Sequence, residues 1–254
     1  MATSLSIPCP TSSPLPALPA GFLRHHLAWP LVAGLLASVV LVQGGGDLRL
    51  ADALFRIQGG HWALREHWLT SGVIHHGGKW ASMLAALAVL GVYLSALRHA
   101  HRARLRRPLL YLVLAIALGS SSVSLLKSLT NVDCPWDLVR YGGTRAAVGL
   151  FAARPAGMPH AACFPAGHAS AGYAWVALYF AALLWQPRWR WHGLAIGLGA
   201  GLLFGGGQQL RGAHFLSHDV SALALCWFLS LGLFVLLQRH PCRSIGHAAM
   251  AMSG

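Results

Sequence analysis

Residues 207–219 read Gly-Gln-Gln-Leu-Arg-Gly-Ala-His-Phe-Leu-Ser-His-Asp and form a polar segment between two long apolar runs. The segment holds Arg211, His214, His218 and Asp219 within nine positions, although only 10% of the chain is charged. Ionisable groups at membrane depth are costly and are usually functional. The segment therefore indicates a membrane-spanning fold with a functional site at a span end. The alternative interpretation is a solvated turn between two helices.

The composition of the 254 residues is that of an integral membrane protein, because 56% are hydrophobic and 29 are glycine. Six runs approach the roughly 20 apolar residues that span a bilayer: residues 26–43, 80–97, 108–126, 169–185, 191–207 and 220–237. The sequence therefore predicts an all-α fold, a polytopic bundle of six transmembrane helices. We expect one membrane domain at 22–239 and cytoplasmic tails at 1–21 and 240–254, the first of them disordered and without the features of a signal peptide.

The formal net charge of +13 is typical of nucleic-acid-binding domains, but its distribution excludes that class here. Ten of the 19 Lys and Arg residues lie in short segments that alternate with the other loops: Arg24, Arg98, Arg102, Arg104, Arg106, Arg107, Arg188, Arg190, Arg239 and Arg243. All six acidic residues fall in the other loops or at their span ends. By the positive-inside rule both termini are cytoplasmic and the acidic side is exported.

Three polar clusters stand at span ends on the exported side. The first is Lys127 with Cys134-Pro135, the second is Pro165-Ala-Gly-His168, and the third is the segment 211–219. They share one face because the third and fifth spans end there and the fourth and sixth begin there. Chance would scatter such clusters over both faces, so we expect them to form one site.

The five cysteines divide by compartment. Cys134 and Cys163 share the long exported loop 127–168, whereas Cys9 and Cys242 belong to the cytoplasmic tails and Cys226 lies within a span. Disulfides persist in oxidising compartments such as the bacterial periplasm. We therefore predict a Cys134–Cys163 disulfide that joins the start of this loop to its end.

Two further patterns concern packing. Tryptophans in and beside the exported segment 44–79 indicate residues at the membrane interface; within it, 61–69 is expected either as a short amphipathic helix or as plain packing. The fifth span carries glycine at every fourth position (Gly193, Gly197, Gly201 and Gly205), a small-residue face that lets another helix approach closely.

The three clusters resemble the motifs of the type 2 phosphatidic-acid phosphatase superfamily, which comprises membrane lipid phosphatases and related acid phosphatases. The family pattern is Lys-x6-Arg-Pro, Pro-Ser-Gly-His and Ser-Arg-x5-His-x3-Asp. This chain has Lys127-x6-Cys134-Pro135, Pro165-Ala166-Gly167-His168 and Gly207-Gln208-x5-His214-x3-His218. The resemblance covers about residues 47–237. The runs Cys-Pro-Trp-Asp-Leu (134–138), Cys-Phe-Pro-Ala-Gly-His-Ala-Ser (163–170) and Arg-Gly-Ala-His-Phe-Leu-Ser-His (211–218) are similar to those of a bacterial membrane-associated branch.

The resemblance implies a two-step phosphoryl transfer without a metal or other cofactor. His214 would attack phosphorus and form a phosphohistidine. His168 would protonate the leaving oxygen and then activate water, which suits an imidazole near neutral pH. Lys127 would bind phosphate oxygens, and backbone N–H groups near Gly167 would offer a helix N-terminus to the same anion.

Four positions depart from the family pattern. Cys134 and Gln208 replace phosphate-binding arginines, Ala166 replaces a serine, and His218 replaces the acid that orients the nucleophile. We expect other cations to have taken over phosphate binding, with Arg211 one helical turn after Gln208 and with Arg140 and Arg145 in the exported loop. Asp219 is expected to orient His214 directly or through His218.

Four rival interpretations stay open at the level of the sequence. His214 and His218, four positions apart and next to Asp219, could bind a metal. A haem protein requires histidines inside spans, whereas these lie at span ends or in loops and tails. A membrane protein that binds lipid phosphates without catalysis would explain the missing arginines. A phosphotransferase could use the same pocket.

The sequence therefore predicts a lipid phosphatase in the bacterial inner membrane, with its active site on the periplasmic face. The expected partners are a lipid phosphate substrate and membrane lipids, and no nucleic acid. Phosphatidic acid, phosphatidylglycerol phosphate, undecaprenyl diphosphate and a phosphorylated outer-leaflet lipid are all candidate substrates, and the sequence does not choose among them or fix the oligomeric state.

Overall fold

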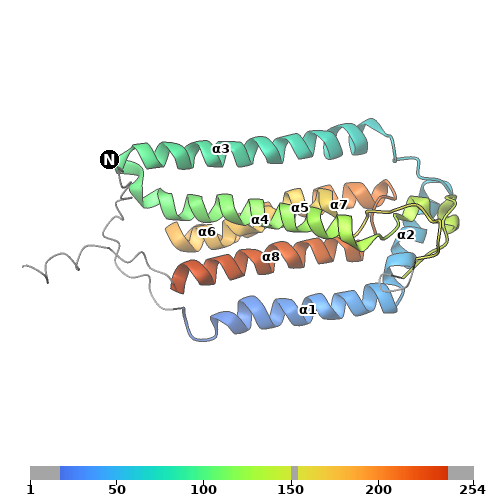
Figure 1. The fold of residues 1–254 in the computed structure, drawn as a ribbon, viewed down its shortest axis with the longest axis horizontal. Coiled ribbons are helices and arrows are strands. Elements are labelled where there is room, and N and C mark those ends of the chain that lie inside the picture. Colours follow the sequence, from blue (N-terminus) through green and yellow to red (C-terminus); the bar gives the residue numbers. More distant parts are fainter. Residues whose placement is uncertain (1–17, 150–153, 240–254) are drawn as a thin grey trace, which may run out of the picture.

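The computed structural model describes residues 18–149 and 154–239, and these form a bundle of long helices joined at one end by a layer of loops (Figure 1). Residues 1–17 of the expected N-terminal tail and all of 240–254, with Cys9, Cys242 and Arg243, lie outside these ranges. Within the described ranges the regular elements are all helical, and Leu138 and Arg145 form an isolated bridge. The predicted all-α class is confirmed.

Among the described residues, four helical segments are long and apolar enough to cross a membrane: Arg24–Gln43, Trp68–Arg98, Ala100–Asp137 and Leu216–Gln238. They comprise α1 (Trp29–Ser38) with its flanking turns, η3 (Trp68–Gly77) with α3 (Gly78–Arg98), α4 (Arg106–Thr130) after η4 (Ala100–Leu105), and most of α8 (Leu216–Arg239). Beside them lie α5 (Gly167–Tyr173), η7 (Ala174–Val176), α6 (Ala177–Trp185) and α7 (Arg190–Leu210) (Figure 1). These four segments are candidate membrane spans, and six spans remain a prediction.

The glycine face of α7 packs against the helix formed by α5, η7 and α6, as the sequence predicts. A Cβ atom at Gly197 would lie 2.3 Å from the backbone nitrogen of Val176, and one at Gly201 would lie 2.0 Å from the ring of Tyr173. No side chain fits at either position, so the backbones approach closely. This contact holds the start of α5 beside the end of α7, where two of the polar clusters lie.

The long loop between α4 and α5 is fastened to the end of α4. A disulfide joins Cys134 to Cys163, and the Cys163 N–H donates to the Val132 carbonyl at 3.0 Å. The Thr130 hydroxyl donates to the Phe164 carbonyl, and the Asn131 side chain accepts from the Ala161 N–H at 2.7 Å. These contacts hold the segment that leads into α5 against the end of α4.

The amphipathic helix expected at 61–69 is wrong, because turns occupy 61–67 and a helix begins at Trp68. The helix of this region is instead α2 (Gly46–Ile57), preceded by Gly45 and followed by Gly59 and Gly60, all three at positive φ. The Asp47 carboxylate at the start of α2 accepts from the Ser217 N–H at 2.9 Å and from its hydroxyl. This contact caps the first turn of α8.

Candidate active site

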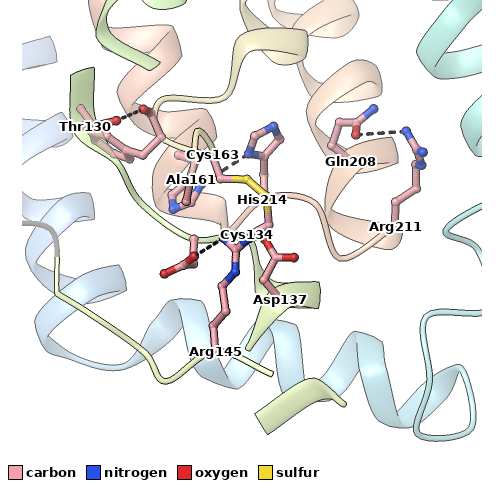
Figure 2. Close-up of a disulfide and its surroundings, with 12 residues drawn as sticks. Thr130, Cys134, Asp137, Arg145, Ala161, Cys163, Gln208, Arg211 and His214 are labelled. Carbon is pink, nitrogen blue, oxygen red and sulfur yellow. Dashed lines mark hydrogen bonds and ion pairs between the residues drawn. A yellow bond between two sulfur atoms is a disulfide. The ribbon is translucent and has the colours of Figure 1, made fainter. Parts of the chain in front are cut away.

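A cavity of about 720 Å³ opens at the loop end of the bundle, where the three polar clusters meet. Six of the residues predicted from the sequence line it: Lys127, Arg145, Gly167, His168, Arg211 and His214. They come from α4, the loop between α4 and α5, α5 and the turn between α7 and α8. Figure 2 shows the disulfide, His214 and the Gln208–Arg211 pair around the same space.

Lys127 lies against the start of α5 at Gly167. A Cβ atom at Gly167 would lie 3.3 Å from Cδ and 3.6 Å from Nζ of Lys127. The ammonium group is therefore close to the first backbone N–H groups of this helix. Positive charge and free N–H donors are the two features that bind a phosphate oxygen.

His168 lies in the first turn of α5 with one ring nitrogen occupied. Its Nε2 is 3.2 Å from the carbonyl oxygen of Ile74 and donates to it, because a carbonyl can only accept. The neutral ring then carries its proton on Nε2, and Nδ1 is the nitrogen that can gain and lose a proton. The ring of His75 packs against His168, with the ring centroids 4.4 Å apart.

His214 lies in the turn between α7 and α8 and is buried. Its Nδ1 is 3.4 Å from Nδ1 of His218, and the backbone carbonyl of Cys163 lies beside both rings. Burial, with the nearby His218 and Lys127, lowers the pKa of His214 well below its ordinary value. The imidazole is therefore neutral at neutral pH and keeps one lone pair.

Asp219 does not have the position expected for an orienting acid. Its carboxylate accepts a hydrogen bond from Nε2 of Gln209 at 2.5 Å and lies against Gly205 of α7. Among the described residues it makes no hydrogen bond to His214 or His218, so the expected role is corrected. His218, which follows His214 by one helical turn, makes the contact with His214 instead.

The three arginines expected to replace the missing motif arginines differ in position. Arg211 is buried, lines the cavity, and donates to the Arg65 carbonyl at 2.7 Å and to Oε1 of Gln208 at 3.3 Å. Arg145 also lines the cavity and pairs with Asp133 at 2.7 Å. Arg140 pairs with Asp52 of α2 through two bonds of 2.8 and 2.6 Å and is not among the cavity-lining residues, so its expected role is corrected.

Sequence reasoning missed several residues that line the cavity, among them His75, Lys79, Trp136 and His160. His75 and Lys79 belong to η3 and α3, which carry none of the three motifs. The one available signal was that Lys79 and Lys127 are the only lysines in the chain. Within the described ranges, no group of three or more His, Cys, Asp or Glu residues could hold a metal ion.

Comparison with known proteins agrees with this arrangement. The family model described as the PAP2 superfamily matches residues 108–242, which is more than half of the chain and includes all three motifs. The chain matches no curated protein. It matches no solved structure.

Proposed function

The chain belongs to the PAP2 superfamily, whose members are phosphatases, and on that premise we propose that it is a membrane lipid phosphatase. It hydrolyses a lipid phosphate monoester or diphosphate without a metal, through a phosphohistidine intermediate. One observation carries the proposal: Lys127, His168 and His214 come from three distant segments and line the same cavity.

In the first step His214 attacks phosphorus. Its Nδ1 faces His218, so a proton on Nδ1 leaves the Nε2 lone pair free for the attack. Lys127 and the N–H groups at Gly167 bind the phosphate oxygens and stabilise the charge that spreads over them in the transition state. The P–O bond to the leaving group breaks as the N–P bond forms.

His168 carries the proton in both steps. Its protonated ring donates from Nδ1 to the departing oxygen, while Nε2 keeps its bond to the Ile74 carbonyl. The neutral ring then takes a proton from water, the water attacks phosphorus, and the N–P bond breaks to release phosphate. The Ile74 carbonyl holds the ring in one orientation throughout.

His218 and the Cys163 carbonyl take the place of the orienting carboxylate of the family pattern. Both contact His214, and the Cys163 carbonyl belongs to the loop that the disulfide fastens. A neutral imidazole accepts a proton less strongly than a carboxylate, but burial keeps competing water away from the pair. This arrangement supports an active enzyme despite the substituted motif.

In the proposed topology the chain crosses the bacterial inner membrane six times. The unbroken helical run 167–185 and the 21 residues of α7 are about 28 and 32 Å long, which is enough to cross the hydrocarbon core. The arginine-rich connection between α3 and α4 lies at the bundle end opposite the loop between α4 and α5 (Figure 1). By the positive-inside rule the cavity then faces the periplasm and both termini are cytoplasmic.

The test is phosphate release from a panel of lipid phosphates, measured in detergent with a chelator present. The native protein is compared with His214→Ala and with His192→Ala, a matched change at an exposed histidine outside the cavity. We expect release by the native protein and by His192→Ala, and a loss of at least about a thousandfold for His214→Ala. Brief reaction with labelled substrate should also leave acid-labile phosphate on the native protein.

Three results would contradict this function. Activity that requires added zinc would favour a metal site. Lipid binding without any phosphate release would favour a recognition protein. Phosphate that appears on an added acceptor lipid, rather than in solution, would identify a phosphotransferase.

A further inference from the structure

A second group of basic side chains lines the cavity but belongs to none of the three motifs. Lys79 lies in the first turn of α3, and His75 lies one turn earlier in η3. Both line the cavity that contains Lys127 and His168. The only two lysines of the chain thus reach one cavity from two different helices.

Close packing between α3 and α7 fixes the position of this group. Gly78 is buried, and a Cβ atom there would lie 2.5 Å from the ring of Phe204. The centroid of the Phe204 ring is in turn 5.2 Å from that of His168. Because residue 78 is glycine, α3 approaches closely enough to hold His75 and Lys79 beside the proposed acid–base histidine.

A chain of hydrogen bonds fixes the tautomer of His75. Nη1 of Arg211 donates to Oε1 of Gln208, so the amide presents Nε2 to Nδ1 of His75, at 2.8 Å. His75 accepts at Nδ1 and carries its proton on Nε2. The Nε2–H group is then a donor that can bind an anion, and Gln208, at a motif arginine position, serves to orient it.

The cavity has the volume and the positive charge to accept a second phosphate group. Neither lysine forms an ion pair with any of the six acidic residues, all of which lie in the described ranges. The cavity of about 720 Å³ falls within the size range of sites for small molecules, roughly 300–1,000 Å³. A substrate with a second phosphate would neutralise the second ammonium group.

We propose, on the basis of the proposed function, that Lys79 and His75 form a second phosphate-binding subsite and that the substrate is a lipid diphosphate. The terminal phosphate lies at Lys127 and His214. The inner phosphate, which carries the lipid, accepts hydrogen bonds from the Lys79 ammonium and from Nε2–H of His75. His168 belongs to the first turn of α5 and its ring packs against His75, so it lies where the two phosphates join.

The reaction at such a substrate is balanced by the groups present. Nε2 of His214 bonds to the terminal phosphorus, the bond from that phosphorus to the bridging oxygen breaks, and the bridging oxygen takes the electron pair. His168 gives that oxygen a proton. The lipid monophosphate remains at Lys79 as the leaving group, and water then releases inorganic phosphate from His214.

The test compares two substrates that share one tail, farnesyl diphosphate and farnesyl monophosphate, with inorganic pyrophosphate as the diphosphate without a lipid. The native protein is measured beside Lys79→Ala, Lys79→Arg and Arg49→Ala, the last removing one exposed charge outside the cavity. We expect Lys79→Ala to lower kcat/KM for the farnesyl diphosphate about tenfold more than for the monophosphate. Lys79→Arg should largely restore the ratio, and Arg49→Ala should not change it.

Equal losses on the two farnesyl substrates would overturn the second subsite while leaving the phosphatase intact. Faster hydrolysis of pyrophosphate than of farnesyl diphosphate would overturn the lipid part of the assignment. Failure of the native protein to release phosphate from either farnesyl substrate or from the wider lipid panel would overturn the proposed function itself. Because Lys79 is exposed, its variants should keep the native elution profile and melting temperature.

Discussion

Nδ1 of His214 lies 3.4 Å from Nδ1 of His218, and both side chains are buried where the turn after α7 meets the start of α8. In the motif of the family this second position holds a carboxylate. The pair of imidazoles therefore predicts that His218 orients the nucleophile rather than forming part of a metal site.

Replacement of His218 tests that role. We expect His218→Ala to lower kcat about tenfold to a hundredfold with little change in KM, because the substrate still binds while His214 loses its orientation. His218→Asp, which restores the acid of the family motif, should recover activity relative to His218→Ala. A purely structural role would instead lower activity and melting temperature together in both variants.

The pH dependence of kcat/KM should report the burial of His214. The nucleophile must be neutral, and burial lowers its pKa, so the ring stays neutral below its ordinary pKa of about 6.5. Activity should therefore be retained as the pH falls through about 6.5, and the acid limb should lie below that value. An acid limb well above 6.5 would show that another group limits the reaction.

Substitutions at Arg140 and Arg211 should have opposite outcomes. Arg140 is paired with Asp52 and is absent from the cavity lining, so Arg140→Ala should leave KM within about twofold of the native value. Arg211 is buried and lines the cavity, so Arg211→Lys should raise KM about tenfold, since lysine cannot reproduce its directed donors. Steady-state kinetics on one lipid phosphate decide both points.

A count of reactive thiols tests the disulfide. Without reductant, denatured protein should show three reactive thiols out of five, because Cys134 and Cys163 are joined. Reduction should expose all five thiols, lower kcat because the Cys163 carbonyl contacts both imidazoles, and cost about 3 kcal/mol of stability. Five reactive thiols without reductant would contradict the disulfide.

Two glycines of α7 provide a matched test of helix packing. A Cβ atom at Gly197 would lie 2.3 Å from the Val176 nitrogen, whereas one at Gly199 has no neighbour within 4 Å. Gly197→Ala should therefore destabilise the protein by about 1–3 kcal/mol through overpacking. Gly199→Ala should be neutral or stabilising by up to about 1 kcal/mol, because alanine favours helix. Thermal unfolding in detergent measures both.

The sequence predicted those features that apolar runs and motif spacing determine. The helical class, the close glycine contacts and the meeting of Lys127, His168 and His214 follow from patterns within each segment. The pairing of Arg140 with Asp52 and of Asp219 with Gln209 joins residues from separate helices or loops, and neighbouring residues carry no information about such contacts. The same reason hid His75 and Lys79, which reach the cavity only because Gly78 lets α3 approach Phe204.

The disulfide between Cys134 and Cys163 also makes the activity of the protein depend on where the loop lies during synthesis. Under the proposed orientation, the loop of a newly synthesised copy is first in the reducing cytosol, where Cys134 and Cys163 stay reduced. Without the disulfide, the Cys163 carbonyl is not fixed beside the imidazoles of His214 and His218. Such a copy has a lower kcat until its loop crosses to the oxidising compartment and the disulfide forms.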